Sequence, residues 1–321
     1  MSKTRLTRPL KKMKTIAKYL VSMLLLAAAA MPAHALVINP TFDSGYNAEQ
    51  KATVFGAISF LESQVTDNVT FAINFKTSSS GLGASTQGLY GTSYSDVVAA
   101  LNADRTSAND YQAMSHVAAG PADPATGQGM ILFTYAQCFA LGFNCGAQWL
   151  GDISVNLGLV DSNRVDGIAS DKYDMFGVVL HEMDEFLGVG GPGSTVGTGY
   201  PYLGIEDLFR YTSAGVRSYT TVDDDAYFSI DGGATRLARF NQNAWGDYAD
   251  WWSTGPHTPS AQDAFGTPGV ISSYTSAERV ALDVVGWDLA PAQVPEPSTS
   301  MLMLPVLLGL GLRRRRTHKA G

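Results

Sequence analysis

One stretch of this chain decides how the rest is arranged around it: Asp174-Met-Phe-Gly-Val-Val-Leu-His181-Glu182-Met-Asp-Glu185-Phe-Leu-Gly188. Its apolar residues recur at steps of three and four, which is the spacing of one buried helix face. Glycines and a proline follow between positions 188 and 192, and such residues end a helix. The sequence therefore predicts a helix that carries a histidine and two glutamates near its end.

His181 and Glu185 stand at i and i+4, so they project from one face about a turn apart. This is the spacing at which the H-E-x-x-H helix of a metalloprotease offers two ligands to one zinc ion. Glu182 stands where such a helix carries the general base that takes a proton from the attacking water. Here the second histidine is a glutamate, which can still ligate zinc and shifts the preference toward harder ions such as Mn, Fe(II), Mg or Ca.

A complete site needs a further ligand from elsewhere in the chain. Thermolysin-like sites take a third ligand, a carboxylate, from a later segment. We therefore expect Glu206 to be the third ligand, with Asp207 beside it as a neighbouring candidate. His116 and His257 are further candidates that the spacing does not separate.

A simpler interpretation of the His181 and Glu185 pair also exists. Two side chains at i and i+4 can form a solvated pair on a helix surface, which contributes only a few tenths of a kcal/mol. Asp184 makes the end of this helix more acidic still, although helix C-termini prefer cations. A nearby positive group, either a metal ion or Arg210, would offset that cost.

The two ends of the chain differ in charge from its body. Leaving out residues 1–35, with seven basic residues, and residues 295–321, with five basic residues and Glu296, leaves 10 Lys and Arg against 28 Asp and Glu. A body this acidic is a poor binder of nucleic acid or anionic lipid, so we expect no nucleic-acid partner. It suits an exported protein, or one that works with divalent cations.

Residues 1–35 have the organisation of a signal peptide, with a basic start, an apolar run and the sequence Ala33-His34-Ala35 as a cleavage site. We expect export through the Sec translocon, cleavage by signal peptidase and a mature chain that begins at Leu36. In an exported chain the only two cysteines, Cys138 and Cys145, are expected to form a local disulfide.

Periodicity predicts the other elements of the body. Helical spacing covers residues 47–64 and 274–287, and a further helix begins at Ser95 as N-cap. Strand patterns cover 69–75, 130–135 and 153–157. Two segments rich in glycine, residues 78–92 (also rich in serine) and 188–204, are predicted to be loops.

The C-terminal tail carries Val294-Pro295-Glu296-Pro297, an apolar run from 301 to 312 and four arginines. It closely resembles the PEP-CTERM sorting signal over residues 294–321. The resemblance implies a Gram-negative host and a short transmembrane stretch that serves as a transient inner-membrane anchor. It further implies cleavage by an exosortase, and a final location at the cell surface or outside the cell.

The body resembles a family of zincin-like metalloproteases that often carry this same tail. The residues that carry the resemblance are Tyr173-Asp174 before His181-Glu182, Asp207-Leu-Phe-Arg210-Tyr211, Tyr227-Phe-Ser-Ile-Asp231, Asp250-Trp251 and Ala281-Leu-Asp283-Val-Val-Gly-Trp287. The resemblance implies one α+β zincin-like domain over residues 36–293, with the ligand helix beneath a small mixed sheet. It matches His181 to a ligand and Glu182 to the general base; the third ligand of metzincins would fall at Gly191, which has no side chain to offer.

The sequence thus predicts a metal-dependent peptidase that binds Zn²⁺ or another divalent metal and acts on a protein or peptide substrate. Two alternatives remain open at this point. One is a zincin-like surface or matrix protein that has lost catalysis together with the ligand histidine. The other is a glycan-binding module that stacks sugars on Trp251 and Trp252.

Overall fold

The computed structural model describes residues 36–146, 151–222, 225–255 and 257–291. The predicted signal peptide at 1–35 and the sorting signal at 294–321 lie outside these residues. In the described part, no helix combines the length and the apolar character that crossing a membrane requires.

The described part is a mixed α and β fold with several small sheets, so the expected α+β class is correct. Its helices are α2 (Ala48–Glu62), α3 (Tyr94–Asp104), α4 (Ala108–Met114), α5 (Tyr135–Ala140), α6 (Met175–Leu187) and α7 (Ser276–Val284). Two short 3-10 helices, η1 (Gly191–Gly193) and η2 (Glu206–Phe209), follow α6.

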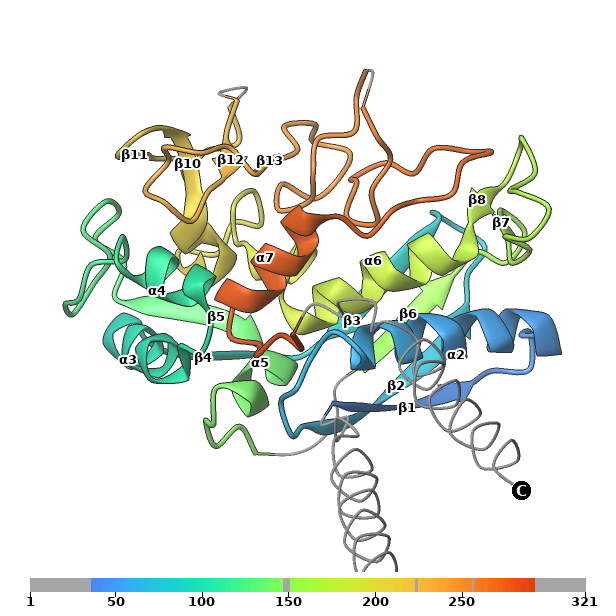
Figure 1. The fold of residues 1–321 in the computed structure, drawn as a ribbon, viewed down its shortest axis with the longest axis horizontal. Coiled ribbons are helices and arrows are strands. Elements are labelled where there is room, and N and C mark those ends of the chain that lie inside the picture. The colour runs from blue at the N-terminus through green and yellow to red at the C-terminus, as the bar shows by residue number, and fades with distance from the viewer. Residues whose placement is uncertain (1–35, 147–150, 223–224, 256, 292–321) are drawn as a thin grey trace, which may run out of the picture.

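The main sheet has the strand order β1-β2-β6-β3. Its strands are β1 (Val37–Phe42), β2 (Thr70–Thr77), β6 (Gly151–Val155) and β3 (Gly83–Gln87). The first three run parallel, and β3 is an antiparallel strand at the edge, where Ser85 pairs with Ile153. Helices α2 and α6 lie side by side over one face of this sheet (Figure 1).

Smaller sheets complete the fold. One joins β4 (Leu89–Ser93), β5 (Met130–Thr134) and β9 (Leu203–Gly204), and another joins β11 (Val216–Arg217), β10 (Arg210–Ser213), β12 (Tyr227–Phe228) and β13 (Ala238–Arg239). A two-stranded pair, β7 (Val160–Asp161) and β8 (Tyr173–Asp174), leads into α6. The long segment that follows β13 crosses α6 on the side away from the sheet (Figure 1).

Local sequence signals place most elements correctly. Asn47 accepts a hydrogen bond from Gln50 N and begins α2, and Gly188 ends α6 in the left-handed conformation with φ +89°. In α7, Leu282 is fully buried and Val285 directly after the helix is too, as expected. Helix α3 begins two residues earlier than predicted, because Ser93, not Ser95, caps it by accepting from Asp96 N.

The prediction of a loop over residues 78–92 is wrong from residue 83 onward. Strand β3 and most of β4 lie in that part. The segment was predicted to be a loop because glycine and serine are poor strand formers in isolation. They form a strand here because β3 pairs along β6 and lies against α6, where larger side chains would have no room. The backbone pairing and this close approach override the local preference.

Cys138 and Cys145 are placed as a disulfide pair, with a Cα–Cα distance of 6.2 Å. This agrees with the pairing expected from the sequence. The bridge closes α5 onto the turn that follows it. It is therefore a local constraint, and it does not position the charged residues of α6.

Three carboxylates gather where the ends of distant segments meet. The oxygens of Asp67, Asp104 and Asp288 lie within 4.8 Å of one another. Burial, with the neighbouring negative charge of Asp288, raises the pKa of Asp67 to about 7 and that of Asp104 to about 6. The folded protein therefore binds more protons here than the unfolded chain does between about pH 4 and 7. Its stability falls as the pH rises through that window.

We expect Asp104→Asn to stabilise the protein at pH 8 and to have little effect at pH 4.5, because only the ionised cluster is repulsive. Thermal unfolding in EDTA, which prevents a divalent cation from neutralising the cluster, should show Tm raised at pH 8 by about 2–4 °C for each kcal/mol of relief. Asp171→Asn, at an exposed carboxylate, is the control. An equal shift at both pH values for Asp104→Asn would contradict the electrostatic explanation.

Candidate metal centre

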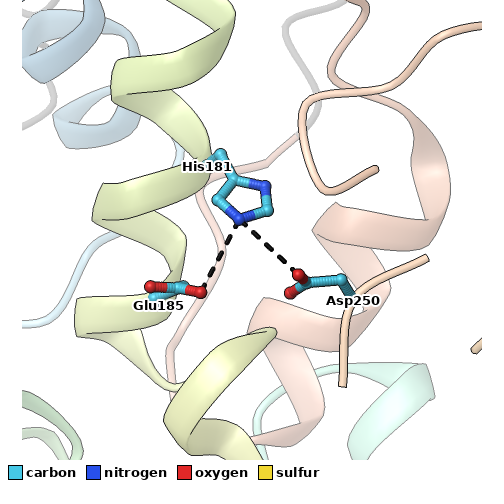
Figure 2. Close-up of side chains that lie close together, drawn as sticks. All are labelled: His181, Glu185 and Asp250. Atoms are coloured by element: carbon cyan, nitrogen blue, oxygen red, sulfur yellow. Dashed lines mark ion pairs between the residues drawn. The ribbon is translucent and has the colours of Figure 1, made fainter. Parts of the chain in front are cut away.

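Helix α6 brings His181, Glu182 and Glu185 to the boundary between the sheet and the segment that crosses it. The apolar side chains of the helix, among them Val179, Met183 and Phe186, are fully buried and fix its orientation. His181 and Glu185 point to the same side, as their spacing predicts (Figure 2). Glu185 is only 5% exposed, so the interpretation as a solvated surface pair does not hold.

His181 lies between two carboxylates. Its Nε2 atom is 3.6 Å from Glu185 Oε1 and 3.7 Å from Asp250 Oδ2 (Figure 2). Its other nitrogen, Nδ1, is 3.0 Å from the Ala261 carbonyl oxygen. A carbonyl can only accept, so Nδ1 carries the hydrogen and donates it, which leaves the Nε2 lone pair facing the two carboxylates.

Each carboxylate is held by one oxygen and leaves the other free. Glu185 Oε2 accepts a hydrogen bond from the Ser85 hydroxyl on β3. Asp250 Oδ1 accepts from Gln262 Nε2 at 2.9 Å and from Gly191 N at 3.2 Å. The remaining oxygens, Glu185 Oε1 and Asp250 Oδ2, are the ones that face His181. Outer partners of this kind orient the ligands of metal sites.

The spacing of the three free atoms suits a metal ion. In the described part of the chain, His181, Glu185 and Asp250 each offer one ligand atom, and these atoms all lie within 4.8 Å of one another. Ligands about 2.0–2.1 Å from a tetrahedral zinc ion stand about 3.4 Å apart, close to the observed 3.6 and 3.7 Å. A hydrogen-bonded ion pair would be shorter, about 2.7–2.9 Å. One nitrogen and two carboxylate oxygens therefore fit a divalent cation.

The charges of the site also favour a bound cation. Burial alone would lower the pKa of His181, but the negative charges of Asp250 and Glu185 outweigh it and raise the pKa well above the ordinary value. Burial and its carboxylate neighbours likewise raise the pKa of Asp250. Buried like charges are costly unless a positive group balances them. The site thus needs either a proton or a metal cation at its centre.

Glu182 faces the same cavity without a protein partner. It is 5% exposed, and its carboxylate makes no hydrogen bond or ion pair with any residue of the described part. Burial and the charge of Glu185 raise its pKa well above the ordinary value. A carboxylate that acts first as a general base and later as an acid requires a raised pKa.

A cavity of about 660 Å³ contains these groups. Its walls are α6, strand β3 with the residues before it, and the segment from Trp245 to Gly266. The cavity is large enough for several residues of an extended peptide. The cavity is only partly open to solvent. A bound substrate would therefore be partly desolvated.

The structure places Glu206 elsewhere. Glu206 is fully buried and its Oε2 accepts from Gly190 N at 3.0 Å, so it supports the turn after α6. It is not in the group formed by His181, Glu185 and Asp250. Neighbouring Asp207 accepts from Thr195 N and Gly204 N and ties that loop together.

The other candidate histidines also lie apart from this group. His257 Nε2 is 2.7 Å from Asp263 Oδ2 in an ion pair at the cavity wall. His116 lies against the glycine turn at Gly232. Neither belongs to the three-residue group that includes His181.

Sequence reasoning did not select Asp250 as a ligand. A signal existed, since the Asp250-Trp251 pair is part of the family resemblance, but nothing in its spacing relates it to α6. Ser85, Ala261 and Gln262, which orient the three ligand side chains, gave no signal at all. Gly191 was excluded as a ligand for want of a side chain, and the structure shows its backbone N–H holding Asp250 instead.

Comparison of the chain with protein-family models, with curated protein sequences and with solved structures gives no match.

Asp250→Asn and Glu206→Gln give opposite predictions for metal content. Replacing Asp250 removes a charged ligand, so we expect the purified variant to lose stoichiometric divalent metal or to bind it at least 10–100-fold more weakly. Glu206→Gln should retain the metal. Elemental analysis with titration of Zn²⁺ and Mn²⁺ into the metal-free proteins measures both. Loss of metal in Glu206→Gln with retention in Asp250→Asn would reverse the assignment.

Gly83→Ala should displace Glu182 without disturbing the ligands. A methyl group at Gly83 would overlap Glu182 Oε1 and lie 2.9 Å from its Cδ, and Gly83 has an ordinary strand backbone that accepts alanine. We expect normal folding and metal content, and at least a tenfold loss of any hydrolysis that depends on Glu182. Gly56→Ala on α2, where a methyl group would meet only Phe176 at 3.6 Å, is the control and should keep full activity.

Proposed function

We propose that this protein is a divalent-metal-dependent peptidase whose metal is held by His181, Glu185 and Asp250. One observation carries the proposal. The ligand atoms of three anchored side chains converge in one cavity, beside a buried Glu182 that has no partner in the described part of the chain. When bound, the metal would act as a Lewis acid that polarises a carbonyl and lowers the pKa of a water molecule. Zn²⁺ and Mn²⁺ are the ions that this donor set favours most clearly.

The residues around the metal site have separate roles in the proposed reaction. Glu182 takes a proton from the attacking water and passes it to the nitrogen of the leaving amine, so its carboxyl is restored at the end of the reaction. Ser85, Ala261 and Gln262 keep the ligand side chains in place through hydrogen bonds. Gly83 leaves the space that the Glu182 carboxyl occupies.

A zincin-like arrangement is part of the proposal. It is supported by a ligand helix that packs on strands β3 and β6 of a small sheet, where β3 is the antiparallel edge strand beside the cavity. The differences from the H-E-x-x-H pattern are Glu185 as the second ligand and Asp250 as the third. This ligand set is more negative than two histidines and a glutamate, and it should give a less acidic metal.

Export to the cell surface is proposed on the sequence of the two ends, together with the cysteines. A disulfide pair at 6.2 Å between Cα atoms suits an oxidising compartment. Secretion of the chain with an intact Cys138–Cys145 bridge, and its retention in the inner membrane when Pro295 and Pro297 are replaced, would test the sorting route.

The decisive experiment compares wild type with Glu182→Gln in metal content and in hydrolysis of casein. Because Glu182 is proposed to move protons and not to hold the metal, the variant should keep the metal and lose about 10²–10⁴-fold in rate. His181→Ala should lose both. Metal-free wild type with no hydrolysis would favour the non-catalytic surface protein, and equal activity of wild type and Glu182→Gln would remove Glu182 from the mechanism.

The glycan-binding alternative loses its main support. Trp251 is 4% exposed and packs on Phe228 and Phe240, so its face is not open to a sugar. Trp252 lies under the guanidinium of Arg239, whose Cζ is 4.0 Å from the ring centre. Neither ring is a free stacking platform.

A further inference from the structure

The wall of the cavity has an unusual charge. It carries five carboxylates, those of Glu182, Glu185, Asp247, Asp250 and Asp263, and neither lysine nor arginine is among the described residues that line it. His181 is the one basic side chain there. A cavity with walls of one sign concentrates ligands of the opposite sign.

Most of these carboxylates already have a partner. A divalent cation between Glu185 and Asp250 would balance both, and Asp263 is paired with His257 at 2.7 Å. Glu182 and Asp247 remain. Asp247 is exposed, and its side chain makes no hydrogen bond or ion pair within the described part of the chain. Once the metal is accounted for, the wall keeps two acidic side chains that have no protein partner in the described part of the chain.

The loop that carries Asp247 also holds an aromatic ring out at the cavity. Trp245 is 91% exposed and lines the cavity, in contrast to the buried Trp251. The loop is fixed by Asn241, which is 1% exposed and donates from Nδ2 to the carbonyl oxygens of Asn243 and Asp247 at 2.9 and 3.0 Å. Trp245 N in turn donates to Asn243 Oδ1 at 3.0 Å.

A large aromatic ring held in water by an ordered loop gains nothing for the fold. Its face is open to a flat or cationic group, because aromatic faces attract guanidinium and ammonium ions. A carboxylate two residues further along the same loop lines the same cavity. Together they offer a negative charge and an aromatic face to a positively charged side chain, in the cavity that contains the proposed metal ligands.

We propose that the cavity selects peptides with an arginine or lysine side chain close to the bond that is cut, with Asp247 pairing its charge and Trp245 covering its face. This inference rests on the proposed peptidase function for its catalytic half. The recognition itself depends only on the cavity wall, so it can be measured by binding alone.

The binding experiment uses two labelled, blocked hexapeptides that differ only by arginine against citrulline, its neutral isostere. Binding is measured by fluorescence anisotropy in a Glu182→Gln background, which prevents cleavage. We expect the arginine peptide to bind about tenfold more tightly, as a hydrogen bond to a charged group implies. Asp247→Asn should abolish that ratio, and Trp245→Ala should reduce it about twofold to fivefold.

Glu49→Gln, which removes an exposed charge on α2 away from the cavity, is the control for net charge and should leave the ratio intact. Equal binding of the two peptides, or a ratio that Asp247→Asn does not change, overturns the inference.

Cleavage of the same peptides by protein with intact Glu182 separates the two proposals. Hydrolysis of both peptides at equal kcat/KM, with no effect of Asp247→Asn, leaves the peptidase standing and refutes the charge selection. Arginine-selective binding that depends on Asp247, with no hydrolysis of either peptide, leaves the recognition standing and refutes the peptidase. Where both hold, Asp247→Asn should raise KM for the arginine peptide and bring its kcat/KM close to that of the citrulline peptide.

Discussion

The contact on which the functional part of this structure depends is that of one imidazole with two buried carboxylates. His181 Nε2 faces Glu185 and Asp250 at 3.6 and 3.7 Å, too far for hydrogen bonds and close enough for a shared cation. Each of the three side chains is anchored through its other polar atom, by Ala261, Ser85 and Gln262 respectively. Such anchoring sets the orientation of the ligands before any ion arrives, which lowers the entropy that binding would otherwise cost.

Two glycines make this arrangement sterically feasible. A side chain at Gly83 would occupy the place of the Glu182 carboxyl, and one at Gly191 would overlap Glu185 Oε1. Gly191 also donates its N–H to Asp250. The acidic helix end is thus accommodated by small residues on both sides, by strand β3 on one and by the turn after α6 on the other. The same crowding explains the glycine at position 83 of β3.

The acidity of the cavity differs in role between its rim and its centre. A divalent ion would satisfy Glu185 and Asp250, but the outer wall at Asp247 stays negative beside the exposed ring of Trp245. Charge at a rim acts mainly on encounter and on partner choice. Charge at the centre acts on the chemistry of the site. In this protein the rim charge comes from the loop that carries Asp247, and the central charge comes from helix α6 and from Asp250.

The sequence by itself determined what depends on neighbours along the chain. The limits of α6, the common face of His181 and Glu185, and the caps of α2 and α6 follow from helical periodicity and from residues such as Asn47 and Gly188. Only the tertiary structure decided the rest. Asp250 reaches His181 because the segment after β13 folds back across α6, and residues 83–87 become a strand because β6 offers them backbone partners. Both depend on contacts between segments far apart in the chain, and local preference carries no information about those.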